Sequence, residues 1–361
     1  MMDYLKSVFT KNRIILLITA GGALLLGLIL TFIGVGVTGK LKDQQFAKRW
    51  SGDNSYAQVS AFFSEMSGFD EDKVKELTYK IESKLAEDSI SAPSENARLY
   101  VTAYSANGKI TISSNIKSVD VKAIGVGGDF FLFHPLELVT GSFFDGEDVM
   151  QDYVILDEDT AWNLFGSNDI VGQFVEIGGV RHVVLGVIKR DEGRLNDLAG
   201  NNEPTVYMSY DSLKSNGTVS YINTFEALMP NVLTGYAKGV MSDNLSSIDE
   251  TRYSVIENSG RFYFTKLLKN VTNFGTRGMN GKGLVYPYWE NIARGYEDYL
   301  TPVACIAVVC YAYAFVIVFI TLIRMWKRRQ IHFKDIKDFA ERQIEVYRER
   351  KANQKEGEYY E

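Results

Sequence analysis

Two long runs of apolar residues stand out near the two ends of the chain. The first extends from Ile14 to Val37 without a charged residue, and the second extends from Pro302 to Ile323. At a rise of about 1.5 Å per residue, each run is long enough to cross a hydrocarbon layer of about 30 Å as a helix. The first run is longer than the apolar core of a cleaved signal peptide, and no Ala-x-Ala site follows it. We therefore expect transmembrane helices at 14–37 and 300–326.

Basic residues beyond the second run predict the orientation in the membrane. This cluster consists of Arg324, Lys327, Arg328 and Arg329. Because Lys and Arg favour the cytoplasmic side, residues 327–361 are expected in the cytoplasm, and two crossings place residues 1–13 there as well. The basic residues at 40–49 fall on the outer side, but long domains are translocated largely regardless of charge. Residues 38–299 are then an extracytoplasmic domain of a two-pass plasma-membrane protein.

The first part of this outer segment alternates between helical and extended patterns. Residues 44–66 are moderately apolar, and we expect them to continue the first helix outward as a stalk. Asp70 is a good N-cap, and apolar residues follow at helical spacing, which predicts an amphipathic helix at 71–86. Asn107-Gly108 is a strong turn signal between residues 99–104 and 109–113, so we expect a β-hairpin there. A further strand is expected at 119–126.

The middle of the chain is richer in strand patterns. Short strands are expected at 153–156, 205–208 and 224–229, and Gly178-Gly179 joins 174–177 to 180–188 as a hairpin. Residues 158–165 read as a short helix capped by Asp157 and ended by Gly166. Residues 254–256 and 263–264 suggest a strand or a short helix. Residues 275–283 form a glycine-rich loop, and the aromatic stretch 286–299 leads into the second apolar run.

Composition and motifs exclude several classes of function. The net charge of −6 argues against a nucleic-acid partner. His134, His182 and His332 show no metal-ligand spacing, and no catalytic motif appears. Gly281-Lys282 lacks the other residues of a phosphate-binding loop, since Thr276 and Gly283 occupy the required positions. The two cysteines lie in the second apolar run, so the outer domain has no disulfide. We expect no enzyme activity, cofactor or metal in this chain.

The C-terminal tail contains one more pattern. Phe333, Ile336, Ala340, Ile344 and Tyr347 fall on one face of a helix, with charges elsewhere. Such a helix either lies on the lipid surface beside the basic cluster or docks a cytoplasmic partner. The candidate docking face is Phe333, Ile336, Ile344 and Tyr347.

Two stretches of the sequence together resemble a known family. The first is VDVKAIGVGGDFFLFHPLELVTGSFF at 119–144, and the second is YVILDEDTAWNLFGSNDIVGQFVEIGGVRHVVLGVI at 153–188. Their order and spacing are similar to the extracytoplasmic core domain of MacB/FtsX-like ABC transporter permeases, over about residues 45–230. The resemblance implies an α+β extracytoplasmic domain, with a porter-like βαβ part and a smaller β-rich part at about 120–205, flanked by the two transmembrane α-helices.

The same resemblance implies a function and partners. Such permeases act as dimers with a cytoplasmic ABC ATPase, and their outer domains transmit force to substrate export or envelope work. They carry four membrane helices, whereas this sequence shows two apolar runs. We therefore expect a permease-type subunit in contact with membrane lipid, an ATPase, and a second permease chain or a homodimer partner. The alternative is an extracytoplasmic sensor or scaffold without transport activity.

Overall fold

The computed structural model describes residues 11–52, 55–92, 94, 97–145, 150–219, 221–279 and 284–357, and the side chains of residues 11, 328–336, 339 and 347–357 lie outside this description. The chain divides into two compact units. One comprises Met1–Gly34 and Val303–Glu361, and the other is Val35–Pro302.

The membrane unit is built from two helices that are long and apolar enough to cross a membrane by length and composition. They are α2 (Lys11–Thr38) and the part of α11 (Tyr288–Gly357) that begins at Val303. Thr19 Oγ1 and Thr31 Oγ1 each lie 2.8 Å from a tyrosine hydroxyl of α11, those of Tyr313 and Tyr311. A Cβ on Gly27 would come within 2.9 Å of the Tyr311 ring, so glycine allows this close approach. Hydroxyl pairs and small residues of this kind hold helices together in lipid.

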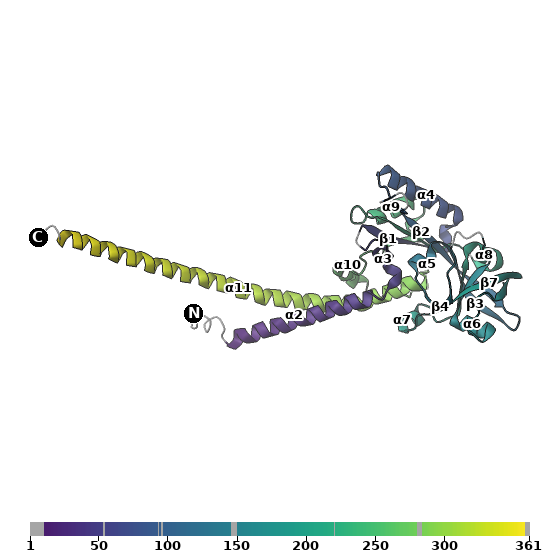
Figure 1. The fold of residues 1–361 in the computed structure, drawn as a ribbon, viewed down its shortest axis with the longest axis horizontal. Coiled ribbons are helices and arrows are strands. Elements are labelled where there is room, and N and C mark those ends of the chain that lie inside the picture. Colours follow the sequence, from purple (N-terminus) through teal and green to yellow (C-terminus); the bar gives the residue numbers. More distant parts are fainter. Residues whose placement is uncertain are drawn as a thin grey trace. The chain divides into compact units, whose positions relative to one another are not determined.

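The outer unit is a mixed α/β domain around one large sheet (Figure 1). Among the described residues its strands are β1 (Tyr56–Phe63), β2 (Val101–Ser113), β3 (Ser118–Gly128), β4 (Glu137–Gly141), β5 (Tyr153–Asp157), β6 (Phe174–Ile177), β7 (Val180–Lys189), β8 (Thr205–Ser209), β9 (Thr218–Val219), β10 (Thr224–Pro230) and β11 (Tyr253–Glu257). The order across the sheet is β11-β1-β10-β2-β3-β8-β5-β7-β4, with β6 paired to β2 and β7, and β9 paired to β2. Most pairs are antiparallel, while β3 with β8 and β5 with β7 are parallel.

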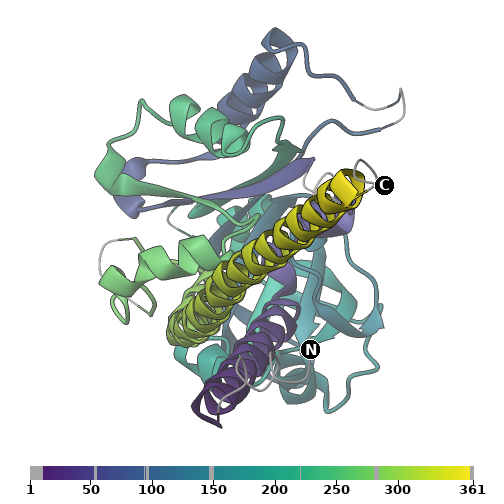
Figure 2. The same ribbon diagram turned by 90° about the vertical axis from the view of Figure 1, so that its left-hand side faces the viewer.

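Helices cover both faces of this sheet. The α-helices of the unit are α3 (Phe46–Ser51), α4 (Glu71–Glu87), α5 (Phe130–Phe133), α6 (Glu158–Phe165), α7 (Arg194–Leu198), α8 (Tyr210–Asn216), α9 (Tyr236–Asn244), α10 (Phe264–Lys269) and the first turns of α11. Single 3₁₀ turns are η1 (Lys42–Gln44), η2 (Glu65–Ser67), η3 (Glu250–Arg252) and η4 (Asn270–Asn273). The helices α4 and α9 lie side by side on the β1 and β10 region (Figure 2).

The predicted capped helices are confirmed, and their caps explain their bounds. The Asp70 side chain accepts a hydrogen bond from Lys73 N at the start of α4, and Asp157 accepts from Thr160 N at the start of α6. Gly166 ends α6 in the left-handed conformation, with φ of 67°. The apolar stripe of α4 is buried against the sheet. The β6–β7 hairpin and the strands predicted at 119–126, 153–156, 205–208 and 224–229 are confirmed as β3, β5, β8 and β10. Where the sequence suggested a strand or a short helix, the structure has both: β11 covers 254–256, and α10 begins at Phe264.

Two local predictions are wrong. Asn107-Gly108 is not a hairpin turn, because β2 continues through it and pairs with β3 from Ala103 to Ser113. Glycine is needed there for another reason: a Cβ on Gly108 would lie 2.6 Å from Thr218 O of β9. The predicted stalk at 44–66 is also absent, since α2 ends at Thr38 and the segment forms α3 and the buried strand β1. The smaller β-rich part at about 120–205 stays a prediction.

One hydrophobic core cluster of the outer unit is rich in aromatic residues. It lies on the sheet face opposite α4 and combines residues of α3, α5, several strands and the start of α11. Phe130, Phe133 and Trp289 are almost completely buried there. Apolar packing of this kind brings the start of α11 against the sheet and keeps water from the polar groups between them.

Candidate functional site

The residues that the sequence singled out do not come together as one site. Ile344 of the predicted docking face is 52% exposed, and the side chains of Phe333, Ile336 and Tyr347 lie outside the described residues. His182 is a buried core residue whose Nε2 is 2.6 Å from Ser212 Oγ. Within the described ranges no group of three or more His, Cys, Asp or Glu side chains could hold a metal ion. The side chain of His332 also falls outside the described part.

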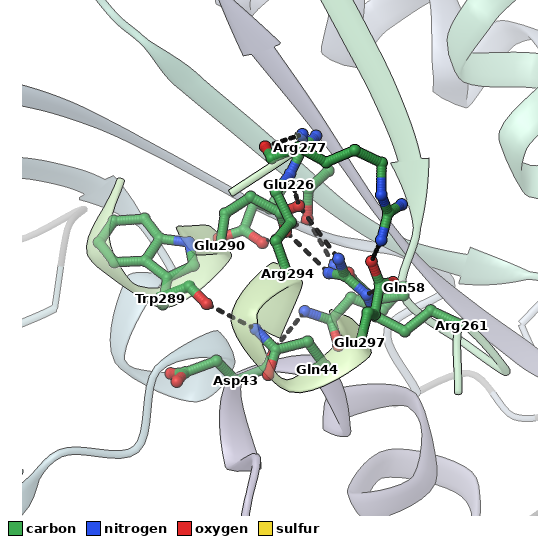
Figure 3. Close-up of polar contacts among 12 residues, drawn as sticks. Asp43, Gln44, Gln58, Glu226, Arg261, Arg277, Trp289, Glu290, Arg294 and Glu297 are labelled. Carbon is green, nitrogen blue, oxygen red and sulfur yellow. Dashed lines mark hydrogen bonds and ion pairs between the residues drawn. The ribbon is translucent and has the colours of Figure 1, made fainter. Parts of the chain in front are cut away.

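A buried network of charged residues instead occupies the attachment of α11 to the sheet (Figure 3). At its centre is Arg261, which is 4% exposed and follows β11. Its Nη1 and Nη2 donate to the two carboxylate oxygens of Glu290 at 2.7 and 3.1 Å, and its Nε donates to Glu297 Oε1 at 2.9 Å. Because both glutamates are on α11, one guanidinium binds this helix at two positions that are about two turns apart.

Two further arginines complete the charge balance of this network. Arg294 Nε donates to Glu290 Oε1 at 2.7 Å, and Arg277 forms an ion pair with the second oxygen of Glu297. The Arg294 guanidinium also lies over the Tyr286 ring at 3.6 Å, and its Nη1 donates to the Arg277 carbonyl. Three arginines therefore face two carboxylates, so neither buried glutamate is left with an unpaired oxygen.

The network continues across the sheet through polar side chains. Arg261 donates to Asn258 Oδ1, and Asn258 Nδ2 donates to Ser60 Oγ on β1 at 2.7 Å. The Ser60 hydroxyl donates to Glu226 on β10 at 2.6 Å. The second oxygen of Glu226 contacts His134 Nε2 at the end of α5. All five residues of this chain of contacts are buried.

The last member of the network lies next to the first membrane helix in the sequence. His134 Nδ1 is 2.9 Å from Asp43 Oδ1, and Asp43 belongs to the 3₁₀ turn η1 that follows α2. The neighbouring Gln44 donates directly to the carbonyl of Trp289 on α11 at 3.3 Å. Gln58 on β1 also donates to the Asp43 carbonyl at 2.6 Å. One continuous set of polar contacts therefore joins η1, the sheet and the start of α11.

Electrostatics favour the charged form of His134. Complete burial lowers its pKa, but the Glu226 carboxylate and the hydrogen bond to Asp43 outweigh burial and raise the pKa to about 9. The imidazolium also packs 4.3 Å from the Trp289 ring, measured between ring centroids, and 4.5 Å from that of Phe130. For Arg261, burial lowers the pKa, and the two glutamates raise it by more, so its pKa lies above the ordinary value. His134 and Arg261 therefore both carry their positive charge at neutral pH.

Sequence reasoning missed this network, although part of it was visible. Glu290, Arg294 and Glu297 are spaced by four and three residues, which places all three on one face of a helix. Charges inside an aromatic stretch that leads into a membrane helix are a sign of burial with a partner. The partner Arg261 lies 29 residues before Glu290, and nothing in its surroundings marks it.

The arrangement links segments of the domain that are far apart in the sequence. The side chains of Arg261, Glu290 and Glu297 are spent on one another and on the neighbouring arginines, and these three residues lie in the protein interior. Its members come from η1 and the start of α11, which connect the domain to the apolar helices, from the strands β1 and β10, and from the segments that follow α5, β11 and η4. Displacing either connecting segment would therefore separate buried charges from their partners.

The fold and this geometry can be compared with known proteins. The MacB-like periplasmic core domain family matches residues 15–240. Relatives include macrolide export ATP-binding/permease proteins MacB from Chromobacterium violaceum, 35% identical over 104 residues, and from Agrobacterium fabrum, 35% identical over 85 residues. These stretches cover 27% and 23% of this chain but only 15% and 13% of the relatives. The aligned part of the chain is thus a small share of each relative's length.

Two solved structures are similar. The periplasmic region of MacB from Actinobacillus actinomycetemcomitans has a TM-score of 0.41 and 14% identity, over 62% of this chain and 96% of that one. The extracellular domain of the noncanonic ABC-type transporter YknZ from Gram-positive bacteria has a TM-score of 0.35 and 18% identity, over 55% of this chain and 99% of that one. Since the family match spans well over half of its residues, the chain belongs to the MacB-like periplasmic core domain family, as a membrane protein with an extracytoplasmic domain.

Proposed function

We propose that this chain is a permease-type membrane subunit of an ABC transporter or mechanotransmission complex. Its outer domain couples ATP hydrolysis by a cytoplasmic partner to substrate export or to work in the cell envelope. The family match and the names of the relatives, which are macrolide export ATP-binding/permease proteins, support this class of function. The partners that this function implies are a cytoplasmic ABC ATPase and a second permease chain or a second copy.

The observation that carries the proposal is the buried network at the connecting segments. Asp43 and Gln44 lie within six residues of the end of α2, and Glu290 and Glu297 lie on α11 before its apolar run. Both connections are fixed to the same sheet through buried charges. A movement of either connection is transmitted to β1 and β10, because sliding at this interface would leave carboxylates unpaired in the interior.

The orientation belongs to the proposal: both termini are cytoplasmic and the large domain is extracytoplasmic. Cys305 and Cys310 can be replaced by serine, so that a single engineered cysteine reports its own side. We expect Ile116→Cys to react with a membrane-impermeant maleimide in intact spheroplasts, because Ile116 is 82% exposed. Asn12→Cys and Glu341→Cys, also at exposed positions, should react only after lysis. Labelling of either one in intact spheroplasts would contradict the two-pass topology.

Partner capture tests the coupling itself. The full chain is purified from its native membrane in mild detergent, and the proteins that accompany it are identified by mass spectrometry. We expect an ABC ATPase, together with a permease chain or a second copy. If neither is present while circular dichroism shows a folded domain, the alternative of a sensor or scaffold replaces the proposal.

The same purification tests the predicted docking face. Replacing Phe333, Ile336, Ile344 and Tyr347 by serine removes the apolar face and is expected to release the ATPase. The matched control replaces four residues from the opposite side of the same helix, Asp338, Arg342, Glu345 and Glu349, by serine. Retention of the ATPase by the first variant, or its loss from the control, would show that this face is not the dock.

A further inference from the structure

A surface segment of the outer domain has unusual chemistry, and apart from Arg277 it takes no part in the charged network. It is formed by residues 262–279, here called the α10 segment, which contain α10 and η4. Four of its apolar side chains are strongly exposed: Tyr263 at 57%, Phe264 at 41%, Val271 at 48% and Phe274 at 53%. Exposed apolar side chains that gather on one short segment, rather than being scattered singly, are typical of an interaction site.

Basic and polar residues accompany these aromatics. Lys266 and Lys269 lie on α10, and the short turn η4 consists of asparagine, valine and threonine. Within α10 only Leu267 is buried, so the helix turns one residue to the protein and most of the others outward. Aromatic rings combined with lysines and short polar side chains are the composition of segments that lie in a lipid headgroup layer.

The position of the α10 segment on α11 identifies what it contacts. Thr301 Oγ1 of α11 is 3.5 Å from the carbonyl oxygen of Leu267, and α10 lies beside α11 in Figure 1. Thr301 directly precedes the apolar run that begins at Pro302. The headgroup layer on each side of the hydrocarbon core is about 5–8 Å thick, which is about one turn of helix. The segment therefore contacts α11 directly before the apolar run, which is the level of the headgroup layer when this run spans the hydrocarbon core.

Two other contacts fix the segment at this level. Arg277 pairs with Glu297 on α11, and the Arg277 carbonyl accepts a hydrogen bond from Arg294. On α11 itself, Tyr299 is 50% exposed two residues before Thr301, which extends the aromatic group along the helix. Tyrosine at this depth is typical of the aromatic belt of membrane proteins.

We infer that the α10 segment is embedded in the headgroup region of the extracytoplasmic leaflet and anchors the outer domain to the lipid surface. Phe264, Val271 and Phe274 insert, and Lys269 binds lipid phosphates. This anchor holds the end of the domain that carries the charged network, while the rest of the domain stays free to move. The inference depends on α11 crossing the membrane and not on coupling to an ATPase, so failure of partner capture leaves it standing.

Depth-dependent quenching tests the inference on the full chain. With both native cysteines replaced by serine, Phe264→Cys and Phe274→Cys are labelled with an NBD fluorophore and reconstituted into phosphatidylcholine–phosphatidylglycerol nanodiscs. We expect strong quenching by a headgroup nitroxide, weaker quenching by a nitroxide near the chain end, and little quenching by aqueous iodide. Leu233→Cys, at a position that is 73% exposed before α9, is the matched control and should be quenched by iodide alone.

Two results would overturn the inference. Iodide quenching at 264 and 274 as strong as at 233 would place the segment in water. Protection from iodide and from both nitroxides would show that a second copy or another protein covers it.

The charge on the α10 segment is tested separately. Lys269→Glu should reduce headgroup quenching at 274 in discs that contain phosphatidylglycerol and leave it unchanged in pure phosphatidylcholine. The matched control is Lys238→Glu on α9, which is also exposed. Equal effects of the two substitutions would refute the lipid-phosphate contact of Lys269.

Discussion

Replacing Arg261 by methionine is the sharpest test of the charged network. Methionine keeps the volume of the stem but leaves Glu290 and Glu297 without their shared partner. Both carboxylates are at most 6% exposed, and breaking a buried ion pair costs about 3–5 kcal/mol. Arg294 and Arg277 each still neutralise one of the two carboxylates, so we expect the lower value, about 3 kcal/mol.

That cost predicts two measurable changes in the full chain in detergent. For a unit of this size, 1 kcal/mol corresponds to about 2–4 °C in Tm, so the unfolding of the outer domain should shift down by about 6–12 °C. If the loss is local to the attachment of α11, amide exchange in residues 288–302 should accelerate by about a hundredfold, while that in α4 changes little.

A surface pair gives the matched control. Lys80→Met removes the partner of Glu76 on α4, where both side chains are more than a third exposed. Such a pair contributes about 0.3–0.5 kcal/mol, so Tm should fall by no more than about 2 °C. The reasoning is refuted if Arg261→Met lowers Tm no more than Lys80→Met, or if exchange in 288–302 and in α4 rises equally.

Three further predictions concern other parts of the same domain. Because the pKa of His134 is raised to about 9, its charge stabilises the folded domain by about 3 kcal/mol, fully below pH 6.5 and no longer once the pH has risen through 9. The Tm of the wild type should therefore fall across this pH range, and its difference from the Tm of His134→Gln should vanish at the alkaline end. In denaturant titrations, Gly108→Ala should lower the free energy of unfolding of the domain by about 1–3 kcal/mol, because the new Cβ meets Thr218 O. Gly239→Ala should raise it by up to about 1 kcal/mol, because this glycine is inside α9 and has open space around it. Asp157→Ala should lower the free energy of unfolding by about 3 kcal/mol or more, because this fully buried carboxylate accepts hydrogen bonds from two backbone N–H groups and pairs with Arg190. A decrease of less than about 1 kcal/mol in the same titration would contradict that account.

Much of the fold could be predicted from the sequence where local chemistry decides. The helix α4 and the helix α6 have an acidic N-cap and an apolar stripe or a terminal glycine, all within one segment. The β6–β7 hairpin has its Gly-Gly turn, and both glycines have positive φ. In each case the residues that determine the element are neighbours in the chain.

The two errors arose where distant pairing overrides local preference. Asn107-Gly108 favours a turn, but eleven residue pairs with β3 and the contact with β9 hold it extended. The strand β1 lacks an alternating pattern because it is buried on both faces, and its partners β10 and β11 are far along the chain. Nothing within 44–66 distinguishes such a strand from the apolar continuation of a helix.

The charged network was hidden for the same reason. Ser60 and Glu226 meet across 166 residues, and His134 meets Asp43 across 91. Each is an ordinary polar residue in its own segment. The face formed by Glu290, Arg294 and Glu297 could have been found from spacing, but its partner could not.

Stability alone does not explain why this attachment is charged. Buried ion pairs often add no net stability over apolar side chains of similar volume, and Trp289 already packs α11 on Phe130. Apolar contact by itself is not directional and would let the helix rotate or slide. Arg261 binds Glu290 and Glu297 at once, so it fixes both the rotation and the height of α11. A slide of one turn, about 5.4 Å, would take both carboxylates out of hydrogen-bonding reach. Pulling on α11 therefore moves the sheet with it, as the proposed force transmission requires.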